Sequence, residues 1–163
     1  MLTGPKIYSV KSCFVSAPAG IDLGYLPEAL SRRGISWEWA KAGATDVINV
    51  YAAIREAEIF IAVAKGARPD YRVIHETGVA AALEKPILLI MSRHSKLPID
   101  LHLFSVANVK LTDERALNFH LDAFLAAPRR SVFEDHASIS SSVPGPPSVP
   151  ASKVPRPIAS DLF

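Results

Sequence analysis

One acidic side chain, Glu76, stands where a carboxylate could do chemistry. It follows the buried-strand pattern of residues 59–63 and lies in the first turn or so of a helical pattern that starts near Asp70. Parallel sheets bind ligands at the carboxyl ends of their strands, toward which helix N-termini point. The positive end of a helix also favours an ionised carboxylate. We therefore expect Glu76 to face a ligand crevice.

The neighbours of Glu76 on its helix leave two interpretations open. Arg72 precedes it by four residues and Ala80 follows it by four, so one side carries a charge and the other a small side chain that leaves space for a ligand. Alternatively, Glu76 is a surface residue in a helical ion pair with Arg72, worth about 0.2–0.5 kcal/mol.

The loop after the first predicted strand is built from small residues. Ser16, Ala17, Pro18 and Gly20 would let a sugar or phosphate approach the backbone, and the next helix would offer free N–H groups. The loop matches neither the GxGxxG nor the Walker pattern, and a plain tight turn would have the same composition. These four residues are candidate ligand contacts.

Residues near two other strand ends are further candidate ligand contacts. Lys65 and Arg68 follow the third predicted strand, where they could meet a phosphate or a carboxylate. Solvated loop cations would give the same pattern. Trp39 ends the second predicted strand, where it could stack on a base or simply pack in the core.

No metal or cofactor is expected. His75-Glu76 lacks the second histidine of a zinc helix because position 79 is valine, and the remaining histidines show no metal-ligand spacing. The single Cys13 lies in an apolar run and excludes a cysteine-rich metal site. The Gly-x-Ser-x-Gly elbow of α/β hydrolases is absent from the sequence.

Alternating strand and helix patterns predict the scaffold that positions these residues. Strands are expected at residues 12–17, 35–39, 58–63, 87–91 and 106–111, with helices between them. This alternation predicts a three-layer α/β sandwich with right-handed crossovers. A five-stranded parallel sheet of order 2-1-3-4-5, as in flavodoxin-like folds, would place its switch point between the first and third strands.

Capping and breaking residues set the expected helix boundaries. Apolar residues recur at helical spacing from Leu23 to Gly34, a plausible C-terminal stop. Asp46 would cap a second helix, and the Glu76 helix would end before Pro86. Residues 112–114 open the last helix, whose buried face is expected to be Leu117, Leu121, Phe124 and Leu125.

Length and composition suit one domain, predicted at residues 1–127. The chain has 163 residues and 49% apolar content, enough for one core. From Pro128 onward it holds seven of its 13 prolines and many serines, a composition that buries too little apolar surface to order itself. We interpret residues 128–163 as a disordered tail or linker, with a proline-rich docking ligand as the alternative.

The charge balance argues against nucleic acid as a partner. With 18 basic and 16 acidic residues, the chain lacks the concentrated basic face that nucleic-acid binding needs. The sequence also shows no secretory signal pattern and no apolar run approaching about 18 residues. A soluble, cytoplasmic protein without membrane contact is expected.

Three segments carry a family likeness. Residues 14–18 (Phe-Val-Ser-Ala-Pro) and 53–63 look like the first strand with its loop and a later helix-to-strand element of one superfamily. Residues 76–87 are similar to its E-x-G-x-A-x-A-x-x-K-P signature. Over residues 13–111 the chain resembles the bacterial TIR-like domains and their relatives, the nucleoside 2-deoxyribosyltransferases.

The resemblance implies that Glu76 acts on an N-glycosidic bond, where it would bind the ribose and stabilise or capture the oxocarbenium-like centre. It implies a nucleotide substrate: NAD, as in TIR-like NAD nucleosidases, or a nucleoside, as in deoxyribosyl transfer or N-hydrolysis. Self-association and a part in antiviral defence are also implied. A non-catalytic module that senses a nucleotide or assembles with partners is the third alternative.

Leaving-group chemistry favours NAD. Nicotinamide departs as a neutral molecule without a proton donor, whereas a base leaving a deoxynucleoside benefits from general acid help. No second carboxylate is convincingly paired with Glu76, because Asp70 is expected to cap the helix. Two departures from the family patterns leave the substrate open. Residues 70–72 replace the Gly-Thr pair common in deoxyribosyltransferases, and the Ser-x-Trp-Cys run of eukaryotic TIR domains is absent.

Overall fold

Strands and helices alternate along the chain. The computed structural model describes residues 9–39, 47–66, 70–92, 95 and 101–128, all within the unit Met1–Val132. The strands are β1 (Ser12–Ser16), β2 (Ser36–Trp39), β3 (Ile59–Ala64), β4 (Ile87–Met91) and β5 (Ser105–Asn108). The helices are α1 (Leu26–Ser31), α2 (Val47–Glu56), α3 (Tyr71–Ala82), the short 3-10 helix η1 (Leu101–Leu103) and α4 (Glu114–Ala126).

The five strands form one parallel sheet in the order β2-β1-β3-β4-β5, which confirms the predicted order. The order reverses direction between β1 and β3, where Ser16 pairs with Ala62. The carboxyl ends of these two strands therefore lie side by side at the switch point, which is where open α/β sheets bind ligands.

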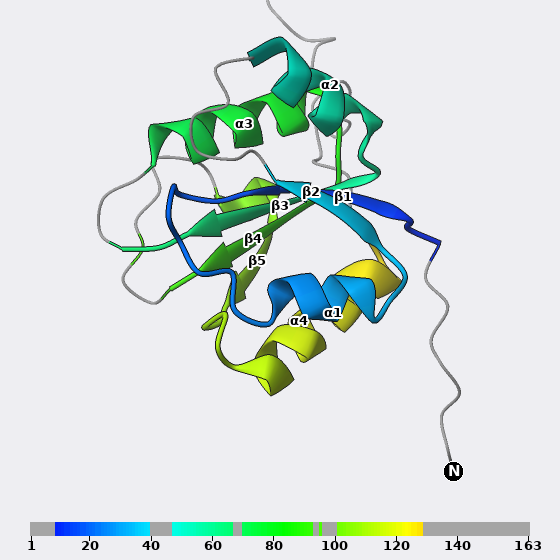
Figure 1. Ribbon diagram of the computed structural model, residues 1–163, viewed down its shortest axis with the longest axis vertical. Helices are drawn as coiled ribbons and strands as arrows, with labels where there is room; N and C mark the ends of the chain where they lie inside the picture. The colour runs from blue at the N-terminus through cyan, green and yellow to red at the C-terminus, as the bar shows by residue number, and fades with distance from the viewer. Residues whose placement is uncertain (1–8, 40–46, 67–69, 93–94, 96–100, 129–163) are drawn as a thin grey trace, which may run out of the picture. The chain divides into compact units, whose positions relative to one another are not determined.

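Helices cover both faces of the sheet, as Figure 1 shows. α2 and α3 lie on one face, and α1 and α4 lie on the other. This is the expected three-layer, flavodoxin-like sandwich.

Each face of the sheet has its own apolar core because successive strand residues point to opposite sides. On β1, Cys13 and Val15 pack on the α1–α4 side. Phe14 packs on the α2–α3 side, where its ring stacks on that of Phe60 with centroids 5.8 Å apart. The next side chain on the Phe14 side of β1 is Ser16, so its hydroxyl must face the α2–α3 layer.

Several boundaries differ from the expected ones by a few residues, as is usual at element ends. α1 begins at Leu26 rather than near Leu23, because Gly24 has a φ of 54° and Pro27 lies in the first turn. Gly34, with a φ of 68°, follows the helix as expected. β5 spans Ser105–Asn108 instead of residues 106–111.

Other boundaries agree with the sequence or lie outside the described residues. α3 ends at Ala82, before Pro86, and the four apolar residues expected on the buried face of α4 are all buried. The predicted cap at Asp46 and the predicted tail beyond Pro128 lie outside the described part of the chain, so both stay predictions. Within that part, no helix is long and apolar enough to cross a bilayer.

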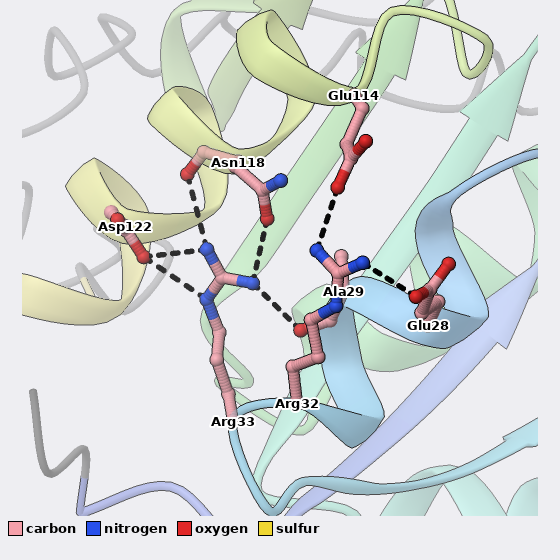
Figure 2. A network of polar contacts seen from close by, with 7 residues as sticks. All are labelled: Glu28, Ala29, Arg32, Arg33, Glu114, Asn118 and Asp122. Carbon is pink, nitrogen blue, oxygen red and sulfur yellow. Dashed lines mark hydrogen bonds and ion pairs between the residues drawn. The ribbon is translucent and has the colours of Figure 1, made fainter. Parts of the chain in front are cut away.

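Arg33 fastens the end of α1 to α4 (Figure 2). Its side chain is 11% exposed, and its Nη2 and Nε donate to Oδ1 of Asp122 at 2.7 and 3.0 Å. Its Nη1 donates to Oδ1 of Asn118 at 2.8 Å and to the carbonyl of Ala29 at 2.7 Å. One guanidinium thus caps the last turn of α1 and contacts two successive turns of α4.

Replacing Arg33 should destabilise the protein more than replacing its neighbour Arg32. Arg33→Ala removes the charged hydrogen bonds to Asn118 and Asp122 and should lower the free energy of unfolding by about 2–3 kcal/mol. Arg32 is 53% exposed and pairs with Glu28 and Glu114 at the surface, so Arg32→Ala should change little. Urea unfolding measures both values, and equal losses would contradict this account.

Candidate active site

Glu76 lies on the buried face of α3. Val73, Glu76, Thr77 and Ala80 recur at the i, i+3, i+4, i+7 spacing of a core-facing stripe, and all four are buried. Glu76 is only 3% exposed. The alternative of a surface glutamate is therefore wrong, because the Glu76 side chain is buried. A carboxylate occupies a position that packing alone would fill with an apolar residue.

The start of α3 corrects one expectation. Asp70 is the N-cap as predicted, and its Oδ1 accepts from the backbone N–H groups of Arg72 and Val73 at 3.0 and 3.3 Å. Glu76 is then the sixth residue of α3, in its second turn rather than its first. The field of the helix terminus falls off within the first turn, so the carboxylate needs other partners.

Ser16 supplies the first of these partners. It is the last residue of β1, fully buried, and its Oγ donates a hydrogen bond to Oε2 of Glu76. The alternation along β1 turns Ser16 toward α3, and the small Ala62 beside it on β3 keeps this end of the sheet open for close approach of the helix. The hydrogen bond joins the switch point of the sheet directly to the carboxylate.

Arg72 supplies the second partner. Its Nε lies 3.9 Å from Oε1 of Glu76, an ion pair that is longer than a hydrogen bond. Its Nη2 donates to the carbonyl of Ala17, the residue that follows β1. Arg72 therefore ties the exit of β1 to α3 and leaves Oε1 as the less firmly held oxygen of the carboxylate.

Burial raises the pKa of Glu76 above its ordinary value. The hydrogen bond from Ser16 and the charge of Arg72 act in the opposite direction and lower the pKa, as His75 does more weakly, while Asp70 raises it. Desolvation outweighs these partners. A carboxyl group with a raised pKa at the ligand edge of a sheet is a common property of functional sites.

A pair between α2 and α3 was not expected from the sequence. The Oη of Tyr51 lies 2.5 Å from Nε2 of the exposed His75, and their rings are tilted at 42° with centroids 5.8 Å apart. The sequence could have indicated this contact only if α2 and α3 were already known to be neighbours, because Tyr51 and His75 are 24 residues apart.

The loop after β1 divides into a buried and an exposed part. Ala17 is fully buried and contributes its carbonyl to Arg72. Pro18 and Gly20 belong to a turn closed by a hydrogen bond from the N–H of Ile21 to the carbonyl of Pro18 at 3.3 Å. Gly20 has a φ of 70°, and a Cβ there would meet only open space. This turn leaves the backbone accessible next to the Ser16–Glu76 pair.

Two other candidate ligand contacts are not among the residues that contact Glu76. Trp39 is partly buried against the α1–α4 core, although its buried Nε1 has no hydrogen-bond partner within the described residues. Lys65 lines a cavity of about 430 Å³ whose lining does not include Ser16, Arg72 or Glu76. Arg68 lies outside the described residues.

The structure therefore brings together Ser16, Ala17, Arg72 and Glu76, with Pro18 and Gly20 in the adjoining turn. Among the described residues, no cluster of histidine, cysteine and acidic side chains could hold a metal ion. The central group is a carboxylate with one hydroxyl donor and one guanidinium.

Several solved structures share this fold, although no protein-family model matches the sequence and no curated protein does. The 2-deoxyribosyltransferase of Bacillus psychrosaccharolyticus is 16% identical with a TM-score of 0.51, over 74% of this chain and 98% of that chain. A Clostridium botulinum CMP N-glycosidase is 22% identical with a TM-score of 0.48, over 69% and 99%. A flavodoxin-like domain from Synechococcus is 17% identical with a TM-score of 0.48, over 71% and 99%.

At these identities the likeness is one of fold. The match to the deoxyribosyltransferase confirms the expected resemblance to that family at the level of the fold. The expected resemblance to TIR-like domains stays a prediction.

Glu76→Gln should stabilise the protein, and the gain should depend on pH. Because the folded-state pKa of Glu76 is raised, folding favours the protonated form, and the wild type loses stability as pH rises from the ordinary glutamate pKa through the folded-state pKa. Glutamine carries no charge and avoids this loss. The variant should be more stable than the wild type near neutral pH, with a smaller gain in acid.

Thermal or urea unfolding between pH 4 and pH 8 measures the difference, with Glu84→Gln as the control because Glu84 is exposed just beyond α3. A pH-independent gain, or the same gain in the control, would show that the charge of Glu76 is not the cause.

Ser16→Ala should raise the pKa of Glu76 further, because the hydroxyl stabilises the ionised carboxylate. The free energy of unfolding should fall by about 1–2 kcal/mol at neutral pH. Carbon-detected NMR titration of the side-chain carboxyl measures the pKa. Thr77→Val is the matched control, since the Thr77 hydroxyl donates to the carbonyl of Val73 within its own helix. An unchanged Glu76 pKa in Ser16→Ala would refute the hydrogen bond.

Proposed function

We propose that this protein cleaves the N-glycosidic bond of a nucleotide, with Glu76 as the group that meets the ribose. One observation carries the proposal. A carboxylate occupies a core-facing position of α3, at the switch point of the sheet, and is held there by Ser16 and Arg72. Because this placement costs stability, chemistry at the site is a better explanation for it than packing.

The arrangement suits stabilisation of positive charge. When a glycosidic bond breaks, the sugar carbon becomes oxocarbenium-like, and a preorganised carboxylate in a water-poor site stabilises it more than one in bulk water. Ser16 fixes Oε2, so Oε1 is the oxygen that would approach the sugar. In a transferase or a retaining hydrolase, the same oxygen would form an ester with the sugar carbon as the first nucleobase leaves. A second nucleobase, or water, would then attack the sugar carbon and release the carboxylate.

NAD is the substrate that this site suits best. The nicotinamide of NAD is a positively charged pyridinium that leaves as a neutral molecule, so the reaction needs no proton donor. The acidic side chain that acts on the pKa of Glu76 is Asp70, and its Oδ1 is engaged in capping α3. A purine or pyrimidine leaving a deoxynucleoside would draw more benefit from a general acid.

A non-catalytic nucleotide sensor is the second candidate, and one observation favours it. Glu76 is 3% exposed, so its carboxylate is less accessible than most catalytic groups in a ligand-free site. In such a sensor, Ser16, Arg72 and Glu76 would only order the loop that touches the nucleotide.

Glu76→Gln should abolish base release, lowering the rate by about 100-fold or more because the charge that stabilises the transition state is removed. The protein is incubated with NAD, nucleoside monophosphates or deoxynucleosides, and the released base is quantified by chromatography. It is run over a range of protein concentrations, because the family resemblance implies self-association. Glu84→Gln, the same chemical change at an exposed site, is the matched control.

The outcomes separate the candidates. Nicotinamide release that is lost only in Glu76→Gln supports NAD cleavage, whereas base release from deoxynucleosides alone selects the transferase or N-hydrolase. Ligand binding without turnover at every protein concentration favours the sensor. Full activity in Glu76→Gln would end the assigned role of this residue.

A further inference from the structure

The cavity that Lys65 lines opens at the carboxyl ends of β3, β4 and β5. It has a volume of about 430 Å³, within the range of small-molecule sites. Its lining includes Val63, Ile90 and Val109 from the strand ends and Lys65 and Lys110 from the loops. Val63, Ile90 and Val109 belong to the α1–α4 core, whereas Ala64 and Met91, which also line the cavity, belong to the α2–α3 core, so the cavity lies at the strand ends.

The floor of this cavity is apolar. Val63, Ile90 and Val109 are each buried; Val63 pairs with Ile90 across β3 and β4, and Val109 directly follows β5. Such a surface favours a flat or chain-like apolar group over water, since each Å² of apolar area removed from water contributes roughly 25 cal/mol.

One wall of the cavity is fixed by contact between two loops. The N–H of Tyr25 donates to the carbonyl of Leu111 at 3.0 Å. Gly24 lies so close to that carbonyl that a Cβ on it would be 2.4 Å from the oxygen. The N–H of Gly24 also donates to Oδ1 of Asp22 at 2.8 Å, so this carboxylate is engaged in the loop.

The opposite wall is fixed by serines. The Oγ of Ser95 donates to the carbonyl of Ala64 at 2.9 Å and lies 2.8 Å from the Oγ of Ser92. The N–H of Ser92 donates to the same carbonyl at 3.3 Å. These bonds join the end of β4 to the end of β3. These hydrogen bonds on both sides would lower the free-energy cost of ordering the loops around a ligand.

The charged groups at the cavity favour an anion. Lys65 and Lys110 are exposed, and within the described residues neither has an ion pair with a carboxylate. The described lining of the cavity contains two ammonium groups and one carboxylate, that of Asp22, which accepts a hydrogen bond from the backbone of Gly24.

We propose that this cavity binds a small molecule with an apolar ring or chain and one anionic group. The apolar part contacts Val63, Ile90 and Val109, and the phosphate or carboxylate meets Lys65 and Lys110. The site is distinct from the Ser16–Glu76 pair, since neither of these two residues, nor Arg72, lines the cavity. Its occupation does not depend on the proposed N-glycosidic chemistry.

The experiment titrates the full 163-residue chain, labelled with ¹⁵N, with phenyl phosphate, benzoate, phenol and inorganic phosphate. Phenyl phosphate or benzoate should shift the amide signals at the ends of β3, β4 and β5 and bind more tightly than phenol or inorganic phosphate. The comparison of phenyl phosphate with benzoate decides between a phosphate and a carboxylate ligand. Glu76→Gln should leave these affinities unchanged.

Two kinds of variant test the assigned contacts. Lys65→Gln and Lys110→Gln should each weaken binding of the anionic probe about three- to fivefold and leave phenol unaffected. Lys11→Gln, the same change at the amino end of β1, is the control and should have no effect. Val109→Phe should fill the cavity and abolish binding while the spectrum stays that of a folded protein.

Several results would overturn the proposal. These are amide shifts that cluster elsewhere, affinities that are the same in Lys65→Gln, Lys110→Gln and Lys11→Gln, or tight binding retained by a folded Val109→Phe. Equal affinity for phenol and phenyl phosphate would likewise exclude an anion-selective site.

Discussion

The buried hydrogen bond between Ser16 and Glu76 is the contact on which the site depends. A carboxylate removed from water costs several kcal/mol unless hydrogen bonds and charges compensate it. Here one oxygen accepts from Ser16 and the other lies near Arg72, which in turn binds the carbonyl of Ala17. The exit of β1 and the second turn of α3 are thus held at one separation, and any change in the strand or helix register would break both contacts at once.

The alternation of side chains along the strands divides the ligand edge into two environments. Ser16 faces α3, whereas Val63, Ile90 and Val109 face α1 and α4. The Ser16–Glu76 pair lies on the α2–α3 side, and the apolar cavity with its lysines opens at the strand ends, where Val63, Ile90 and Val109 of the α1–α4 core line it. The carboxyl edge of the sheet therefore carries two chemically distinct sites.

The sequence predicted the sheet order and the capping role of Asp70, because strand patterns and caps are local signals. The sequence did not predict how deeply Glu76 is buried, although the spacing of Glu76 from Val73 and Ala80 places all three on the core-facing side of α3. It also grouped Trp39 and Lys65 with Glu76. Trp39 ends β2 and Lys65 follows β3, but neither contacts Glu76, because strand order and loop path decide which side chains meet, and tertiary packing sets these.

The close approach of Gly24 to Leu111 links two loops that are far apart in sequence. Tyr25 is 40% exposed, yet its amide is bonded to the carbonyl of Leu111, so its hydrogen should exchange with solvent as slowly as those of the strands. The connection before α1 and the connection before α4 therefore behave as one rigid unit. A change in the length of either connection would disturb the other, because the backbones of Gly24 and Leu111 pack directly against each other.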